Sequence, residues 1–296
     1  MIGGNGFIGR AVTHAVSASG NPVSVFTRQR PFTSNGQPHP ALARSSVVVH
    51  VAGTITPATA EQRPDLAAQD ITLLRAVLGS LRGTSRPPVF VLASSGGTIY
   101  SPHADLPHHE DAPLDPTSAY GTAKLAQERE LRAAAWVTPV VLRLSNVYGA
   151  GQSAGAGLGV IAHWVRAVAD GEPIRIIGQS RRDYLHITDA AAAFRAVVHQ
   201  ADRLRGTGAT LNIGSGVMTS LDELHRQLEN ATGTSIPARR EEPRPFDRQD
   251  SCLDITRARH VLGWSPLVPL ATGLADALHE VLPARALRSG FKPTRC

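Results

Sequence analysis

The stretch Gly3-Gly4-Asn5-Gly6-Phe7-Ile8-Gly9 decides the fold of this 296-residue chain. Its glycines Gly3, Gly6 and Gly9 have the spacing of the turn between a strand and a helix that binds a dinucleotide. Gly3 permits a tight turn, Gly6 lets the backbone approach a pyrophosphate, and Gly9 lets the helix lie close to the sheet. The triplet alone is weak evidence because glycine is common. A helix expected over 7–19 and a strand expected over 23–27 supply the context of a cofactor site.

Beyond this turn, short β-branched runs alternate with longer amphipathic stretches, which is typical of βαβ units and a parallel sheet. The predicted fold class is α/β, a Rossmann-type doubly wound parallel sheet with a smaller C-terminal substrate-binding lobe. We expect the NAD(P)-binding domain to comprise 1–146 and 183–216, the lobe 147–182 and 217–284, and a disordered tail 285–296. Further strands are expected over 46–51, 88–93, 139–144 and 210–213, and further helices over 65–81, 120–134, 158–170, 188–199 and 220–231.

The composition excludes several classes of protein. No apolar run approaches the roughly 18 residues of a membrane-spanning helix, and the N-terminus lacks a signal-peptide pattern, so we expect a cytoplasmic protein. The net charge of +6 is scattered and aromatic residues make up only 5 %, so nucleic acid is not an expected partner. Two cysteines, Cys252 and Cys296, cannot form a disulfide framework. The run His108-His109-Glu110-Asp111 lacks the helical spacing of a metal site, so no metal is expected.

The N-terminal region departs twice from the usual dinucleotide-binding pattern. The strand before the glycine turn is reduced to Met1-Ile2. Because losing buried residues from a central strand would cost several kcal/mol, we expect a translation start upstream, with a stub strand as the alternative. At the end of the strand 23–27, Thr27 is followed by Arg28 and Arg30 where NAD-binding folds carry an acidic residue. A guanidinium there suits the 2′-phosphate of NADP, and the alternative is a pair of solvated loop arginines.

A second motif places chemistry on a helix. Tyr120 and Lys124 are four residues apart near the start of the expected helix 120–134, so their side chains lie on one face. The ammonium group, together with a cationic nicotinamide, would lower the pKa of the phenol toward the working pH. Such a phenol can exchange a proton with a substrate oxygen while hydride moves at the attached carbon. The sequence therefore predicts an oxidoreductase site.

With these motifs the chain resembles the extended short-chain dehydrogenase/reductase family, and within it the NAD-dependent epimerase/dehydratase branch, which acts on nucleotide sugars. The resemblance covers nearly the whole chain. It rests on the glycine turn, on Tyr120 and Lys124, and on HVAG at 50–53, ASSGGTIY at 93–100, LRLSNVYG at 142–149, RDYLHITD at 182–189, LNIGSG at 211–216 and LGW at 262–264.

The resemblance implies roles for individual residues. Tyr120 would be the acid/base, Lys124 would tune it and contact the cofactor ribose, and Thr98 or Ser95 would hold the substrate oxygen. Other expected contacts with NAD or NADP are Gly3, Gly6, Phe7, Ile8, Gly9, Thr27, Arg28, Ala52 and Gly53. Residues matching diphosphate-binding positions are Asn146, Arg182 and Arg244. A homodimer is also implied, for which the apolar stripe Leu66, Ile71, Leu74 and Leu78 would serve either as interface or as core.

Several departures narrow the chemistry. Gly96 stands where the family carries the catalytic serine or threonine, and Gly97-Thr98 replaces the acidic pair of sugar 4,6-dehydratases, so dehydration is not expected. The segment 29–45 is too short for the usual helix and third strand, and the family's asparagine after Gly53 appears as Asp70 or Gln69. The predicted function is an NAD(P)-dependent epimerase or 4-ketoreductase acting on a nucleotide-diphosphate sugar. The alternative is a non-catalytic nucleotide-binding or regulatory relative with a degenerate cofactor site.

Overall fold

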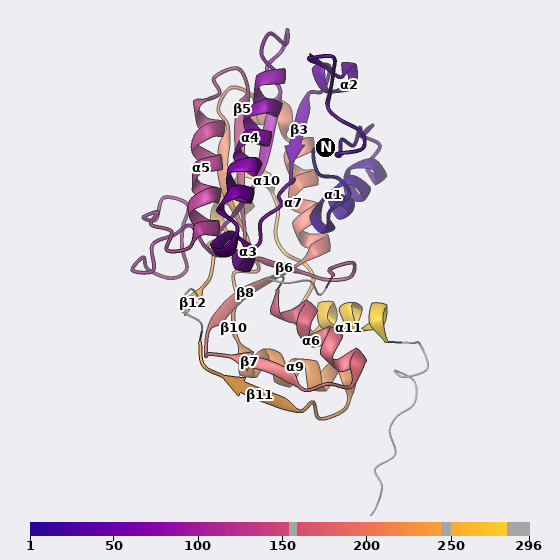
Figure 1. Cartoon of the computed structure of the whole chain (residues 1–296), viewed down its shortest axis with the longest axis vertical. Coiled ribbons are helices and arrows are strands. Elements are labelled where there is room, and N and C mark those ends of the chain that lie inside the picture. The colour runs from indigo at the N-terminus through magenta and orange to yellow at the C-terminus, as the bar shows by residue number, and fades with distance from the viewer. Residues whose placement is uncertain (154–158, 244–249, 283–296) are drawn as a thin grey trace, which may run out of the picture.

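A computed structural model describes residues 1–153, 159–243 and 250–282. Figure 1 shows two layered parts, with a parallel sheet and its helices in one and a smaller group of helices and strands in the other. The expected tail at 285–296 and the predicted ligand Arg244 lie outside the described residues. No described helix has both the length and the hydropathy needed to cross a membrane.

The central sheet is parallel. Its order is β3-β4-β5-β9, and the bounds are β3 Val47–His50, β4 Val89–Ser95, β5 Thr138–Leu144 and β9 Ala209–Ile213. Beyond β3, Ile2 forms parallel bridges to both His50 and Phe26. The stub Met1-Ile2 therefore occupies the central position that the fold requires.

The strand expected over 23–27 is wrong in extent, because only Phe26 pairs with the sheet. Its amide donates to the Met1 carbonyl at 2.8 Å, and its own carbonyl accepts from Gly3 N at 3.1 Å. After Ile2 the chain turns away at Gly3, so the ladder to Phe26 does not continue in that direction.

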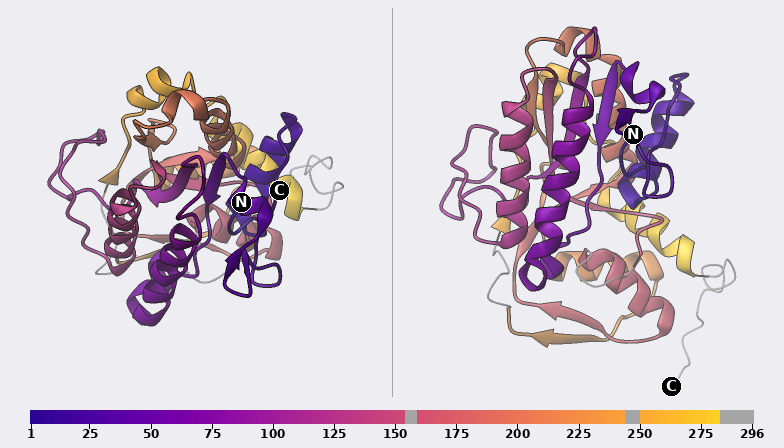
Figure 2. Two further views of the ribbon diagram at one scale, coloured as in Figure 1. Left: turned by 90° about the horizontal axis from the view of Figure 1, so that it is seen from above. Right: turned by 45° about the horizontal axis from the view of Figure 1, so that its top comes forward.

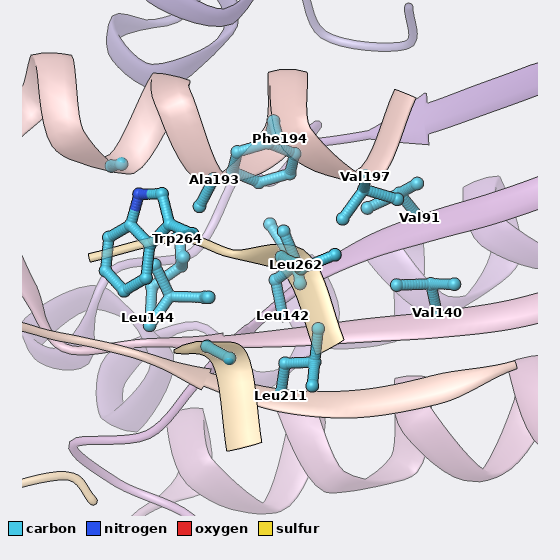
Figure 3. Packing of buried hydrophobic residues seen from close by; sticks show 14 of the residues in the cluster. Val91, Val140, Leu142, Leu144, Ala193, Phe194, Val197, Leu211, Leu262 and Trp264 are labelled. Carbon is cyan, nitrogen blue, oxygen red and sulfur yellow. The ribbon is translucent and has the colours of Figure 1, made fainter. Parts of the chain in front are cut away.

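Helices cover both faces of the sheet, as predicted for a doubly wound fold (Figure 2). One face packs against α1 (Phe7–Ala18), α7 (Ile187–His199) and α10 (Thr256–Leu262), and the opposite face against α4 (Pro64–Ser80) and α5 (Ala119–Ala133). Figure 3 shows the first of these cores, in which Phe194 and Val197 of α7 face Val91 and Leu142 of the sheet. Alternate strand residues enter the two cores, so the strands are apolar on both faces.

The edge of the sheet beyond Phe26 is short, which fits a trimmed edge, one of two explanations for the short segment 29–45; the other is a deletion in the gene. This edge contains a hairpin, β1 (Thr33–Ser34) and β2 (Gln37–Pro38), whose turn residues Asn35 and Gly36 have φ values of 51° and 74°. A single helical turn follows, α2 (Pro40–Ala43). Leu42 packs with Phe26 in the α4-side core, so this turn covers the edge of the sheet beyond Phe26.

In the smaller part the helices expected over 158–170 and 220–231 are confirmed, whereas its strands and its last helix were not predicted. In it β8 (Arg181–His186) pairs with β6 (Asn146–Tyr148), β10 (Met218–Ser220) and β12 (Asp250–Ser251), and β7 (Ile174–Ile177) pairs with β11 (Ala238–Glu241). Its core joins α6 (Val160–Asp170), α9 (Leu221–Thr232) and α11 (Leu270–Val281) around Trp164. Two short helices, α3 (Pro57–Gln62) and α8 (Ala201–Leu204), complete the described elements.

The chain first enters the smaller part directly after β5 and returns to the sheet at α7; it enters again after β9, returns for α10, and its described residues end in the smaller part with α11. The first crossing, after β5, lies at the carboxyl end of the parallel strands, where open α/β sheets bind their ligands. The fold therefore brings the smaller part to the end of the sheet that carries the predicted site.

Candidate active site

The glycine turn has the geometry expected from its sequence. Gly3 has a φ of +87°, and a Cβ atom there would lie 2.6 Å from Cα of Ala52. A Cβ atom on Gly9 would overlap the carbonyl oxygen of Gly3. A Cβ atom on Gly6, by contrast, would meet that oxygen only at 3.5 Å, an ordinary contact. Gly3 and Gly9 are thus needed for packing, whereas Gly6 is exposed and leaves an open backbone surface.

This open surface fits the phosphates of a dinucleotide. Gly6 is the N-cap of α1, and no described side chain caps the helix or places an acidic group in its first turn. The first turn contains Phe7 and Ile8, both half-buried. Helix amides and a positive helix end that lack protein partners attract an anionic group.

At the sheet edge, Thr27 and Arg30 close a tight turn. The Thr27 amide donates to the Arg30 carbonyl at 2.9 Å, and Arg30 N donates to Oγ1 of Thr27 at 3.2 Å. The Thr27 hydroxyl oxygen therefore already accepts a bond from the protein. Arg28, at the tip of this turn, is exposed and lies where the sequence analysis expects a contact with the adenosine part of the cofactor.

Arg10 connects the glycine turn to the smaller part, a contact that the motif did not predict. Its guanidinium donates to the carbonyls of Asn5 at 2.9 Å and Gly151 at 3.0 Å. The amide of Gly151 in turn donates to Glu280 on α11. Arg10 therefore ties the glycine turn to the loop after β6, and this loop is tied in turn to α11.

Tyr120 and Lys124 lie on one face of α5, as their spacing predicts. Ser118 caps this helix by accepting from Gly121 N at 3.1 Å, and Nζ of Lys124 lies 5.8 Å from the centre of the Tyr120 ring. Lys124 is buried, and its Nζ donates to the carbonyl of Ala93 at 3.2 Å. This bond holds the ammonium group at the end of β4.

The ionisation of the pair depends on the protein's own groups as well as on the cationic nicotinamide that the expected fall of the phenol pKa requires. Burial, assisted by the Asp70 carboxylate, raises the pKa of Tyr120 to about 12. Burial also lowers the pKa of Lys124, although the carboxylates of Asp70 and Glu128 oppose it. The protein by itself therefore favours a protonated phenol.

The predicted hydroxyl groups lie at the end of β4. Oγ1 of Thr98 donates to Oγ of Ser95 at 2.9 Å. A Cβ atom on Gly121, next to Tyr120, would overlap the Thr98 carbonyl, so the Thr98 backbone packs against the first turn of α5. Ser95 and Thr98 are thus brought to the neighbourhood of Tyr120.

Leu253 occupies the space that a side chain at position 96 would need, where the resemblance expects a hydroxyl residue. A Cβ atom on Gly96 would lie 2.6 Å from Cδ1 of Leu253 and 3.2 Å from the carbonyl of Arg143. Leu253 is buried in the core beside α7, so its methyl groups have little room to move. The side chain of Leu253 therefore takes the space of a residue at position 96.

A buried polar network lies beneath the site and was not predicted. Glu128 of α5 accepts from Oγ of Ser94 at 2.6 Å and from Nη2 of Arg143 at 2.8 Å. Nη1 of Arg143 donates to the Tyr100 hydroxyl at 3.0 Å, and this hydroxyl donates to Asn212 at 2.6 Å. The network joins α5 to three neighbouring strands. Each member is unremarkable in the sequence, so no local signal identifies it.

The substrate-side residues come from the smaller part. Nδ2 of Asn146 donates to the carbonyl of Asp183 at 3.1 Å, and the half-buried Arg182 lies in β8 beside Asp183. A cavity of about 570 Å³ lies further along β7 and β8. Its lining includes Ile177, Gly178, Gln179, Arg181, Pro243 and Asp250.

The run 108–111 does not converge on one point. Glu110 accepts from Asn212 N at 2.9 Å, Asp111 pairs with Arg257, and Nδ1 of His108 lies 3.1 Å from the Asp105 carbonyl. Within residues 1–153, 159–243 and 250–282, no three His, Cys, Asp or Glu side chains form a metal-binding group.

Comparison with known proteins relates this geometry to a family. The model of the NAD dependent epimerase/dehydratase family matches residues 1–214. The chain is 35 % identical to a UDP-glucose 4-epimerase of Mycolicibacterium smegmatis over 64 % of this chain and 60 % of that protein. It is 34 % identical to a dTDP-4-dehydro-6-deoxyglucose reductase of Escherichia coli, again over 64 % of this chain and 60 % of that protein. These matches thus span less than two thirds of either relative.

A similarity over the whole chain comes from a solved structure. The UDP-glucose 4-epimerase of Thermotoga maritima, in complex with UDP-glucose, superposes with a TM-score of 0.79 at 26 % identity. The superposition covers 94 % of this chain and 96 % of that one. The likeness therefore includes the smaller part, which lies largely beyond the family match.

Proposed function

Because this chain belongs to the NAD dependent epimerase/dehydratase family, we propose that it is an NAD(P)-dependent epimerase or 4-ketoreductase of the extended short-chain dehydrogenase/reductase type, acting on a nucleotide-diphosphate sugar. One observation carries the proposal. The open glycine turn and the pair Tyr120 and Lys124 lie at the carboxyl end of the same parallel sheet. The matched epimerase and reductase support the choice of reaction, and an enzyme is favoured over a non-catalytic relative.

The cofactor would be NAD or NADP. The amides of the turn from Gly3 to Gly9, including those of Phe7 and Ile8, would hold its pyrophosphate, and the backbone at Ala52 and Gly53 would flank it. When bound, its nicotinamide group accepts or supplies the hydride. Arg28 would face the adenosine part from the turn that Thr27 closes.

The proton would move through Tyr120. The phenol donates its proton to a sugar keto oxygen during reduction, and the phenolate removes the hydroxyl proton in the reverse reaction. The hydroxyl groups of Thr98 and Ser95 hold the substrate oxygen in hydrogen-bonding reach, a role that Gly96 cannot take. Lys124, held on the carbonyl of Ala93, provides the positive charge that stabilises the phenolate.

The nucleotide diphosphate would lie along β8 and β6. Asn146 and Arg182 offer an amide and a forked cation for the phosphates, with Arg244 as a third ligand. The lining of the cavity next to Ile177 combines apolar and polar side chains, which suits the nucleotide base. We propose a cofactor domain of residues 1–146 and 183–216 and a substrate lobe of 147–182 and 217–284, with the exceptions that α10 packs on the sheet and that β8 lies wholly in the smaller part.

A homodimer is proposed through the outer faces of α4 and α5. Leu74 and Leu78 of the apolar stripe are buried in the core, so they do not form this face. The outward residues of α4 include Ala68, Thr72 and Ala76, which are small enough for close helix packing. The molar mass in solution, from light scattering, tests the dimer. A cytoplasmic location remains a prediction from the sequence.

Two assays test the function. Calorimetric titration with NAD and with NADP measures binding, and it should be weakened strongly in a Gly6→Phe variant. The protein is then incubated with UDP-glucose, or with dTDP-4-dehydro-6-deoxyglucose plus NADPH. Formation of the C4 epimer identifies an epimerase, and consumption of NADPH identifies a reductase. Failure to bind either cofactor would overturn the proposal.

A further inference from the structure

Asp183 is a buried carboxylate in the middle of β8, directly after the predicted phosphate ligand Arg182. It is 0 % exposed. The proposed reaction gives it no chemical step. A buried carboxylate is costly unless hydrogen bonds compensate it, so the contacts of Asp183 indicate what it does in this fold.

The carboxylate accepts four hydrogen bonds from two segments that are far apart in the sequence. Oδ1 accepts from both N and Oγ of Ser215 at 2.7 Å, in the turn after β9. Oδ2 accepts from Gly216 N at 3.2 Å and from Leu253 N at 3.3 Å, just beyond β12. A Cβ atom on Gly214 would lie 2.3 Å from Oδ2, so the turn lies directly against the carboxylate. Burial raises the pKa of Asp183, and these hydrogen bonds oppose the rise.

Asp183 also marks the point at which β8 changes its pairing partner. The first two residues of β8 pair with β12, whereas its last three pair with β6, and Asp183 lies between the two pairings. The carbonyl of Asp183 accepts from Nδ2 of Asn146, the first residue of β6, at 3.1 Å. Its carboxylate accepts from Leu253 N, two residues beyond the end of β12. Asp183 therefore joins β12 and β6 at their junction on β8.

This junction faces the end of β4 that carries the predicted hydroxyl groups. A Cβ atom on Gly97 would lie 3.9 Å from Oγ of Ser251 in β12 and 4.0 Å from Nδ2 of Asn146 in β6. Ser251 is also the residue of β12 that pairs with Arg182. The strands that Asp183 joins therefore place both predicted phosphate ligands, Asn146 and Arg182, next to residues that line the end of β4.

We propose that Asp183 is a positioning residue for the nucleotide diphosphate, a role that rests on the proposed function. Its carboxylate holds the turn after β9 and the segment after β12 against β8. It thereby fixes the positions of Asn146 and Arg182 relative to the end of β4. Binding of the substrate, and not of the cofactor, depends on Asp183, because the glycine turn and Lys124 lie on other elements, at α1 and α5.

Replacement by asparagine removes this support with almost no change in volume. A carboxylate offers an acceptor on each of its two oxygens, whereas an amide offers only one. In either orientation, the NH₂ group of Asp183→Asn would face a backbone N–H, that of Ser215 or those of Gly216 and Leu253. One of the two segments therefore loses its attachment to β8.

Calorimetric titrations of the full chain with UDP, dTDP, NAD and NADP test this role. Asp183→Asn should raise the Kd of the nucleoside diphosphate that the wild type binds by about ten- to hundredfold, the effect of losing one well-placed hydrogen bond to a charged group. The Kd of the cofactor should stay constant. Ser215→Ala, which removes one hydrogen bond and keeps the carboxylate, should weaken the same nucleotide by a smaller factor, and it covers the case in which Asp183→Asn does not fold. Unchanged nucleotide affinity in the folded variants, or an equal loss for nucleotide and cofactor, would overturn the proposal.

Asp189→Asn is the matched control. Asp189 is also a buried carboxylate, and it accepts from a backbone amide, that of Val268 at 2.9 Å. It binds the segment before α11 instead of the segments at the junction. Asp189→Asn should therefore lower Tm and leave the Kd of the nucleoside diphosphate unchanged, which separates positioning from general stability. An equal rise of this Kd in Asp189→Asn and Asp183→Asn would contradict the positioning role.

Amide hydrogen exchange provides a measurement that needs no nucleotide. The amides of Ser215, Gly216 and Leu253 should be protected in the wild type and exchange faster in Asp183→Asn. If the wild type binds neither UDP nor dTDP, the proposed function fails and the substrate role of Asp183 fails with it, whatever the protection of these amides. If the wild type binds one of them and Asp183→Asn binds it equally well, only the role of Asp183 is refuted.

Discussion

Replacement of Glu128 by glutamine tests whether the buried network holds α5, and with it Tyr120, against the sheet. The side chain of Glu128 is fully buried, and that of its partner Arg143 is 2 % exposed. Glu128→Gln keeps the size of the side chain and removes the carboxylate charge that faces this guanidinium. Breaking a buried ion pair costs about 3–5 kcal/mol, and glutamine keeps some hydrogen bonds, so we expect a loss of about 3 kcal/mol in the free energy of unfolding.

The pH dependence provides a second test of the same pair. Burial by itself would raise the pKa of Glu128, but the hydrogen bonds and charge of Arg143 outweigh it and hold the pKa below its ordinary value of 4.5. A lowered pKa in the folded state adds stability above this value, and the added stability is lost as the pH falls through the folded-state pKa. The difference between wild type and Glu128→Gln should therefore be full at pH 7 and shrink below pH 4.5.

Urea unfolding, followed by the fluorescence of the three tryptophans, measures both effects. The matched control is Glu130→Gln, two residues further along α5, where the glutamate pairs with Arg75 at the surface. Surface pairs contribute little, so this variant should leave the free energy of unfolding nearly unchanged. Equal losses in the two variants, or a loss in Glu128→Gln that does not depend on pH, would refute the reasoning.

Three further outcomes follow from the site. Gly9→Ala should lower Tm and abolish cofactor binding in calorimetry, because its Cβ atom would overlap the Gly3 carbonyl oxygen; unchanged binding would contradict the packing role. Tyr120→Phe should reduce kcat by about 10²- to 10⁴-fold while the Kd for the cofactor stays constant, since it removes only the proton carrier. Arg10→Ala should raise the Kd for the cofactor by about tenfold, because two hydrogen bonds that hold the glycine turn against the Gly151 loop are lost. An unaltered Kd would show that this link does not shape the turn.

The second, smaller part shows where sequence patterns fail. Its strand β8 begins with Arg181, Arg182 and Asp183, a charged run that resembles a loop in a single sequence. In the structure these residues form a strand because β10 and β12 pair with it from distant parts of the chain. Asp183 is buried there and accepts bonds from Ser215 and Gly216. Only this pairing makes a strand of the segment.

The sequence by itself determined the features that depend on local geometry. The glycine turn follows from the sequence for two reasons. Gly3 has a positive φ, and at both Gly3 and Gly9 the neighbouring backbone lies too close for a side chain. The pairing of Tyr120 with Lys124 follows from the period of a helix, and the α/β class follows from the alternation of strands and helices.

The tertiary structure alone decided what surrounds these residues. Asp70 binds the loop at Thr54, and Leu253 fills the space beside Gly96, only after distant segments have packed together. Such contacts arise from the packing of whole elements, which local spacing does not encode. The same packing excludes water and brings a carboxylate close, so the proton affinity of Tyr120 is set by the fold rather than by its neighbours in the sequence.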